Sequence, residues 1–115
     1  MADQPDTSRA KETRRLLLER RSVVRFPSQL DALVHTSVKW PARVREISTK
    51  GISLVIGRSF APGTILAIQL LRDKDAPPFP VSAEVLHVIP ESCGYVHGCQ
   101  LAQELTSEEL SLLIQ

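Results

Sequence analysis

Six short segments of alternating apolar and polar residues constrain the fold of this chain more than any other feature of its sequence. Alternation with a period of two is typical of a β-strand that has one buried face. Pro41 is expected to end the first segment, and Gly51 lies in a turn before the third. Six short strands joined by turns predict a small antiparallel β-barrel. The segments cover residues 33–40, 42–47, 52–56, 64–71, 81–89 and 94–102.

Both flanks of the predicted barrel carry helix signals. Ser8 can cap a helix, and residues 9–20 contain good helix formers, so we expect a short N-terminal helix that ends near Arg21. Residues 106–109 read Thr-Ser-Glu-Glu, a capping box that begins a second helix. Its apolar face is expected to cover an open end of the barrel. The residues of that face are Leu110, Leu113 and Ile114.

The composition fits one modest domain. The chain has 115 residues, of which 43% are hydrophobic, but only one Trp, one Tyr and three Phe, so the core must be mainly aliphatic. No apolar run approaches the ~20 residues of a membrane-spanning helix, and the first six residues lack a signal-peptide core. We therefore expect a cytoplasmic protein without membrane insertion. Residues 1–18 are expected to form a leader with a basic helical segment, and residues 19–115 to form the barrel domain.

Basic residues concentrate near the N-terminus. Residues 9–25 contain seven Arg or Lys against two Glu, a net charge of +5, whereas the whole chain carries only +1. A local basic segment argues for one anion-binding site and against a general polyanion surface, although residues 9–15 could also be a solvated helix face. RNA-binding barrels usually expose aromatic residues for base stacking, and this chain has few. We therefore expect no nucleic-acid polymer as a partner.

The first of two short motifs is an arginine pair. Arg21 and Arg25 form R-x-x-x-R, and Arg20 stands directly before them, on the linker between the predicted N-terminal helix and the barrel. A guanidinium offers five donors on a planar fork. It can pair bidentately with a phosphate or with the O6 and N7 edge of guanine, and it can stack on a purine. The motif therefore favours an anionic guanine nucleotide.

The second motif follows the second predicted strand. Residues 46–51 read E-x-S-x-x-G. Glu46 supplies a carboxylate acceptor, and the hydroxyl of Ser48 can donate to a phosphate or accept from a base. Gly51 permits a tight turn and a close approach of backbone or ligand. Each motif is a weak signal alone, but their order and their placement around the first two strands make the pair more specific.

The two motifs together resemble those of the PilZ family, which are R-x-x-x-R and D/N-x-S-x-x-G. The resemblance covers roughly residues 19–115 and includes residues 62–64, residues 94–101 and the start of the last helix. PilZ domains are six-stranded antiparallel barrels with a C-terminal helix, and they are bacterial receptors for cyclic di-GMP. The resemblance thus implies a set of ligand-binding residues, namely Arg20, Arg21, Arg25, Glu46, Ser48 and Gly51.

The resemblance also implies a function and a stoichiometry. It predicts that nucleotide binding is converted into a conformational or protein-interaction output, through a downstream protein. Arg20 directly before the arginine pair implies an intercalated pair of cyclic di-GMP molecules on each domain. Glu46 departs from the family's Asp or Asn by one methylene, or about 1.3–1.5 Å of reach, which predicts weaker binding or a shifted base. The alternative is a degenerate PilZ-like adaptor that binds a protein partner without nucleotide.

The sequence signals for metal binding, catalysis and a disulfide are weak. His35, His87 and His97 fall in three predicted strands without zinc-site spacing, and no catalytic triad or phosphate-binding loop can be named. We therefore expect no enzyme activity, no metal site and no cofactor besides the ligand. Cys93 and Cys99, placed in one strand, would lie ~20 Å apart, too far for a disulfide, and are expected to be two buried thiols. Trp40 is expected to be a partly packed strand end, with ligand stacking as the alternative.

Overall fold

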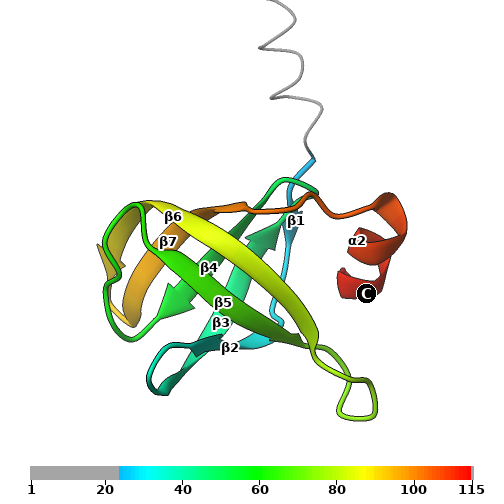
Figure 1. Cartoon of the computed structure of the whole chain (residues 1–115), viewed down its shortest axis with the longest axis horizontal. Helices are drawn as coiled ribbons and strands as arrows, with labels where there is room; N and C mark the ends of the chain where they lie inside the picture. Colours follow the sequence, from blue (N-terminus) through cyan, green and yellow to red (C-terminus); the bar gives the residue numbers. More distant parts are fainter. Residues whose placement is uncertain (1–23, 115) are drawn as a thin grey trace, which may run out of the picture.

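The computed structural model describes residues 24–114, which form a mainly β structure, as predicted (Figure 1). The predicted N-terminal helix lies outside the described residues, as do Arg20 and Arg21. The strands are β1 (Phe26–Pro27), β2 (Asp31–His35), β3 (Lys39–Ile47), β4 (Gly51–Ile56), β5 (Ile65–Leu71), β6 (Phe79–Glu91) and β7 (Gly94–Leu101), and the helix is α2 (Ser107–Leu113). Within this range, no helix has the length and hydropathy needed to cross a membrane.

Six of the strands close into an antiparallel barrel. Around it they run β2, β3, β4, β7, β6 and β5, and β5 pairs again with β2. The two-residue β1 pairs with the end of β3, beyond β2. The chain from β1 to β2 therefore follows one edge of β3. The predicted six-stranded barrel is confirmed, with β1 as an addition at its rim.

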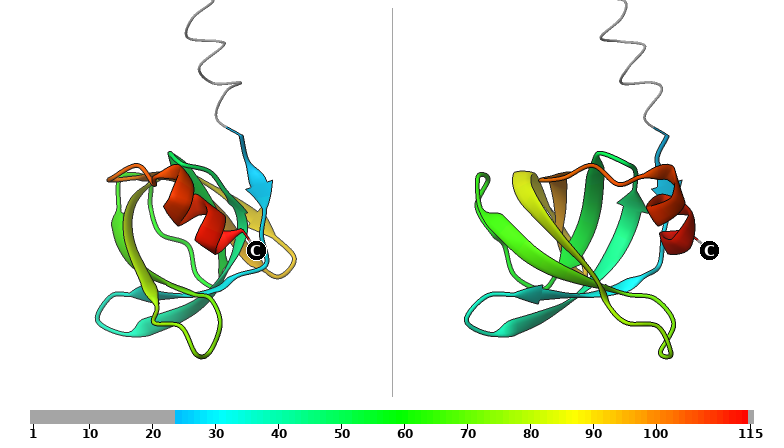
Figure 2. Two further views of the ribbon diagram at one scale, coloured as in Figure 1. Left: turned by 90° about the vertical axis from the view of Figure 1, so that its right-hand side faces the viewer. Right: turned by 45° about the vertical axis from the view of Figure 1, so that its right-hand side comes forward.

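The helix α2 lies across one end of the barrel (Figure 2). Its capping box forms as predicted: the Glu109 amide donates to Thr106 Oγ1 at 3.0 Å, and the Thr106 amide donates to Glu109 Oε1 at 2.9 Å. Leu110 and Leu113 belong to the core cluster. Phe60 is the one aromatic residue among the buried hydrophobic residues of the described chain, so the core is mainly aliphatic, as expected.

The first predicted strand is interrupted by a turn. The amide and the hydroxyl of Thr36 both donate to the carbonyl of Val38 at 2.9 Å, which reverses the chain between β2 and β3. Trp40 and Pro41 therefore belong to β3, and the prediction that Pro41 ends a strand is wrong. Because β4 pairs with β3 only from Ala42 onward, Pro41 lies beyond that ladder and its missing N–H is tolerated there.

A β-bulge in β3 corrects the predicted faces of the second strand. Simple alternation would put Glu46 on the same face as Val44, inside the barrel, and Ile47 outside. The pairing with β4 shifts register between Val44 and Glu46, so that Arg45 and Glu46 are both exposed while Val44 and Ile47 are buried. A bulge adds one residue to a strand and so reverses the alternation after it. The physical reason is the high cost of burying an unpaired carboxylate.

The two cysteines have different surroundings. Cys99 is buried in β7, and burial raises the pKa of its thiol to about 11. Cys93 is exposed because it lies in the turn between β6 and β7. The prediction of two buried thiols is thus confirmed for Cys99 and wrong for Cys93. Neither cysteine forms a disulfide.

Candidate functional site

The pairing of β1 with β3 brings the two sequence motifs together. Arg25 directly precedes β1, whose residues Phe26 and Pro27 pair with Ile47 and Glu46. The Nη1 atom of Arg25 consequently lies 3.9 Å from Oε1 of Glu46. Both side chains are exposed, by 75% and 48%, so this ion pair contributes little to stability. Its importance is geometric: a donor fork and an acceptor from separate motifs lie side by side.

Ser48 holds the turn between β3 and β4. It is buried, and its hydroxyl accepts hydrogen bonds from the amides of Lys50 at 3.2 Å and Gly51 at 3.0 Å. The amide of Ser48 also donates to the carbonyl of Gly51 at 2.9 Å. In this geometry the serine positions the turn that follows Glu46. Direct contact between Ser48 and a ligand stays a prediction.

Gly51 lies close to the backbone of β7. A Cβ at this position would lie 3.0 Å from the carbonyl oxygen of Cys99, tighter than nine in ten real Cβ contacts. The glycines with positive φ in the described chain are Gly63 and Gly94, so no left-handed backbone explains Gly51. The close backbone approach that the sequence predicted is therefore present, and it comes from the neighbouring strand.

A row of outward-facing residues extends from Glu46 across the barrel wall. Glu46 pairs with Ser53 of β4, Ser53 with Gly98 of β7, and Gly98 with His87 of β6. The imidazole of His87 covers Gly98 so closely that a Cβ there would collide with the ring. The middle of the row has only small residues, and its far end presents an exposed aromatic ring. We call these four residues the outer row.

Sequence reasoning missed three residues of the outer row. Ser53, Gly98 and His87 come from three strands, and only the strand register places them beside Glu46. A further bulge between Val85 and His87 sets the face on which the imidazole lies. One signal was available: a glycine inside a strand often marks a close approach of another group.

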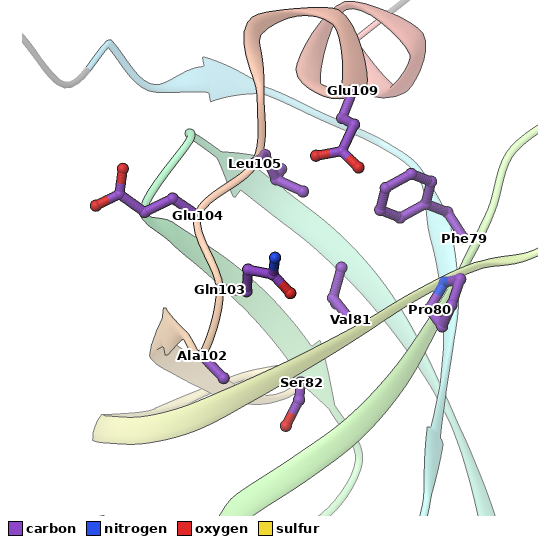
Figure 3. A pocket seen from close by; sticks show the side chains of 9 residues that line it. All are labelled: Phe79, Pro80, Val81, Ser82, Ala102, Gln103, Glu104, Leu105 and Glu109. Atoms are coloured by element: carbon purple, nitrogen blue, oxygen red, sulfur yellow. The ribbon is translucent and has the colours of Figure 1, made fainter.

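A cavity of about 430 Å³ lies elsewhere, between the start of β6 and α2 (Figure 3). It is lined by Phe79, Val81, Leu105 and two carboxylates, Glu104 and Glu109, among others. Glu109 is already engaged in the capping box. None of the motif residues within 24–114 lines this cavity, and its carboxylates would repel an anionic ligand. The outer surface around Arg25 and Glu46 is therefore the better candidate site.

His97 is a buried, neutral part of the core. Its Nε2 accepts from the amide of Phe60 and its Nδ1 donates to the carbonyl of Tyr95, both at 3.0 Å. Burial lowers the pKa of the imidazole. Over residues 24–114 no three His, Cys, Asp or Glu side chains gather where they could hold a metal ion.

Trp40 lies at the start of β3, six residues from Glu46, and is partly packed as predicted. The guanidinium carbon of Arg58 lies 5.5 Å from its ring centroid and 4.4 Å from that of Phe60. A cation therefore already lies over the Trp40 ring. Its position gives no support to ligand stacking at the motif site.

Comparison with known sequences decides the family. The sequence profile of the PilZ domain matches residues 19–115. The chain belongs to the PilZ domain family. None of the curated proteins matches its sequence.

Two solved structures share this fold. The inhibitor of motility MotI/DgrA from Bacillus subtilis aligns with a TM-score of 0.63 and 18% identity, over 79% of this chain and 46% of that one. The PilZ domain of YcgR from Escherichia coli, solved with c-di-GMP, aligns with a TM-score of 0.60 and 10% identity, over 78% of this chain and 83% of that one. This chain thus spans less than half of MotI/DgrA. At these identities the likeness concerns the fold.

The PilZ signature residues of this chain fall into three groups. Arg25 and Glu46 lie side by side on the outer surface. Ser48 and Gly51 shape the turn and the strand contact directly behind Glu46. Arg20 and Arg21 lie outside the described residues.

Proposed function

We propose that this PilZ domain is a cytoplasmic bacterial receptor for cyclic di-GMP that converts binding into a conformational or protein-interaction output. The observation that carries the proposal is the β1–β3 pairing, which sets Arg25 of one motif against Glu46 of the other. The family match and the presence of c-di-GMP in the YcgR structure support it. The proposed role is ligand binding, without catalysis.

The chemistry of the site suits both parts of the ligand. Arg25, together with Arg20 and Arg21, can pair with phosphates or with the O6 and N7 edge of guanine. The carboxylate of Glu46 can accept from guanine N–H groups. The outer row spans four strands, or about 14 Å at ~4.8 Å per strand, which leaves room for a base between Glu46 and His87. The exposed imidazole of His87 offers a surface for stacking.

The proposed output follows from the place of the arginines in the chain. Arg20, Arg21 and Arg25 fall within the six residues before β1. Ligand phosphates and guanines would draw this segment onto the barrel surface beside Glu46. The residues before it would move along, which couples occupancy of the site to a surface that a downstream protein could read.

Isothermal titration with cyclic di-GMP tests the receptor. We expect saturable binding with two ligand molecules per chain, because Arg20 adds a third guanidinium on which an intercalated pair of ligand molecules can stack. GMP, which lacks the second guanine and the cyclic diphosphate, should bind far more weakly. One ligand per chain would contradict the stoichiometry, and no binding by the wild type would favour the adaptor alternative.

Shortening the acceptor should improve the site. In Glu46→Asp the carboxylate returns to the side-chain length that the family pattern uses. We expect cyclic di-GMP to bind about 3- to 10-fold more tightly, because one charge-assisted hydrogen bond regains its best geometry. The same titration measures it. Glu108→Asp, an identical change at an exposed position of α2, should leave affinity unchanged. Weaker binding by Glu46→Asp would mean that this site is adapted to the longer side chain.

A further inference from the structure

An ion pair joins two distant parts of the chain across the outer surface of the barrel. Nη1 of Arg45 lies 2.9 Å from Oε2 of Glu91, and Nη2 lies 2.8 Å from Oε1. The two residues are 46 positions apart: Arg45 is in the bulge of β3, and Glu91 ends β6. Parallel hydrogen bonds of this kind fix the guanidinium in both position and orientation.

The pair lies over strands that contribute to the candidate site. In the barrel order, β4 and β7 stand between β3 and β6. Val96 of β7 pairs with Val55 of β4 and Ile89 of β6, one row from the pairing of Ser53 with Gly98. Val96 is only 8% exposed although it does not belong to the core cluster, which fits a cover on its outer side. The bridge between Arg45 and Glu91 thus spans β4 and β7, the strands that carry Ser53 and Gly98.

Arg45 also adjoins Glu46 directly. The bulge exposes these two consecutive residues together, whereas a regular strand would expose one of them. A guanidinium is therefore held beside the candidate site by an internal carboxylate. That carboxylate is charged, because its hydrogen bonds with Arg45 lower the pKa of Glu91.

We propose that Arg45 is a further phosphate-binding arginine of this PilZ site and that Glu91 is an internal competitor, which holds the Arg45 guanidinium until a ligand phosphate displaces it. This inference rests on the proposed function. A phosphate offers a guanidinium the same bidentate geometry that Glu91 offers. A ligand phosphate can reach the guanidinium because the pair is solvent-accessible, with side chains 46% and 35% exposed.

A second ion pair on β3 serves as an internal comparison. Arg43 and Asp31 face each other directly in the register of β2 and β3, with a single contact of 3.4 Å. Both side chains are about two-thirds exposed. Because β2 and β3 are neighbours, this pair crosses no other strand. Removing Asp31 therefore changes the net charge by the same amount as removing Glu91 without releasing Arg45.

The experiment is a mutant cycle read by cyclic di-GMP titration at one fixed salt concentration. Glu91→Gln should bind about 2- to 5-fold more tightly than the wild type, because the competing charge is gone. Arg45→Gln should bind at least about 10-fold more weakly. In the Arg45→Gln background, Glu91→Gln should bring no tightening. Asp31→Asn is the matched control and should leave affinity unchanged, and thermal melts verify that every variant is folded.

The outcomes separate this inference from the proposed function. If the wild type binds and Glu91→Gln binds equally or more weakly, only the role of Glu91 as competitor is rejected. Tightening that persists without Arg45, or that Asp31→Asn reproduces, would show a general charge effect and reject the inference as well. If neither the wild type nor any variant binds cyclic di-GMP, the proposed function fails and the inference fails with it.

Discussion

The double variant Arg21→Ala/Arg25→Ala is expected to bind cyclic di-GMP at least about 100-fold more weakly than the wild type. Each guanidinium can form charge-assisted hydrogen bonds with phosphate or guanine, worth about 1.5–3 kcal/mol per residue. Two such losses amount to about 3–6 kcal/mol, and every 1.4 kcal/mol is a factor of ten. Isothermal titration of both proteins measures the difference. The fold should survive, because Arg25 is exposed and its ion pair with Glu46 is long.

The control must remove the same charge elsewhere. Arg43→Ala/Lys74→Ala also takes two positive charges from exposed positions, one on β3 and one in the loop between β5 and β6. Its affinity should change less than about 3-fold, because separated surface charges act through screened, long-range attraction alone. Binding that persisted in the Arg21/Arg25 variant would reject the assigned site. An equal loss of affinity in the control would show that the arginine motif contributes to binding only through its net charge.

Much of the barrel follows from local patterns, and its exceptions have local causes. The bounds of four strands were predicted to within about two residues, because glycine or proline marks the turns beside them. The predicted ranges are 52–56, 64–71, 81–89 and 94–102. The turn at Thr36 was missed because it contains neither residue and is closed by a hydroxyl and an amide sharing one carbonyl. The bulge at Arg45 was missed because strict alternation carried Glu46 inward. The signal that could have revealed the bulge is a charged residue at a position that alternation assigns to the apolar interior.

The candidate site depends on pairing that the sequence does not display. The resemblance assigned arginines of one motif and a carboxylate of the other to one ligand site, and the β1–β3 pairing places Arg25 beside Glu46. The contact of His87 with Gly98 joins residues 11 positions apart, through a hairpin whose bulge changes the strand phase. The Arg45–Glu91 bridge spans 46 positions. Such neighbours become visible only once the register of the barrel is known.

His97→Leu is expected to lower the free energy of unfolding by about 2–4 kcal/mol. Leucine keeps the residue apolar, but it leaves the buried amide of Phe60 without its acceptor and the carbonyl of Tyr95 without the Nδ1 donor. It also removes the tilted ring contact with Phe60, whose centroid lies 5.8 Å from that of His97. Urea unfolding measures the loss. His35→Leu, which removes one partly exposed hydrogen bond to Gln69, should cost less than about 1 kcal/mol, and equal losses would contradict the role of His97.

The same histidine should make the wild-type stability depend on pH. In the folded chain burial lowers the pKa of His97, whereas in the unfolded chain the imidazole has its ordinary pKa of about 6.5. Below that pH the unfolded state binds a proton that the folded state resists, so stability falls as pH drops, until the folded pKa is passed. The lowered pKa of Glu91 acts in a separate, more acidic window, below its ordinary value of 4.5. Unfolding at pH 7.5, 6.5 and 5.5 should therefore show a decline in the wild type that His97→Leu largely removes, and an unchanged slope in the variant would assign the decline to other groups.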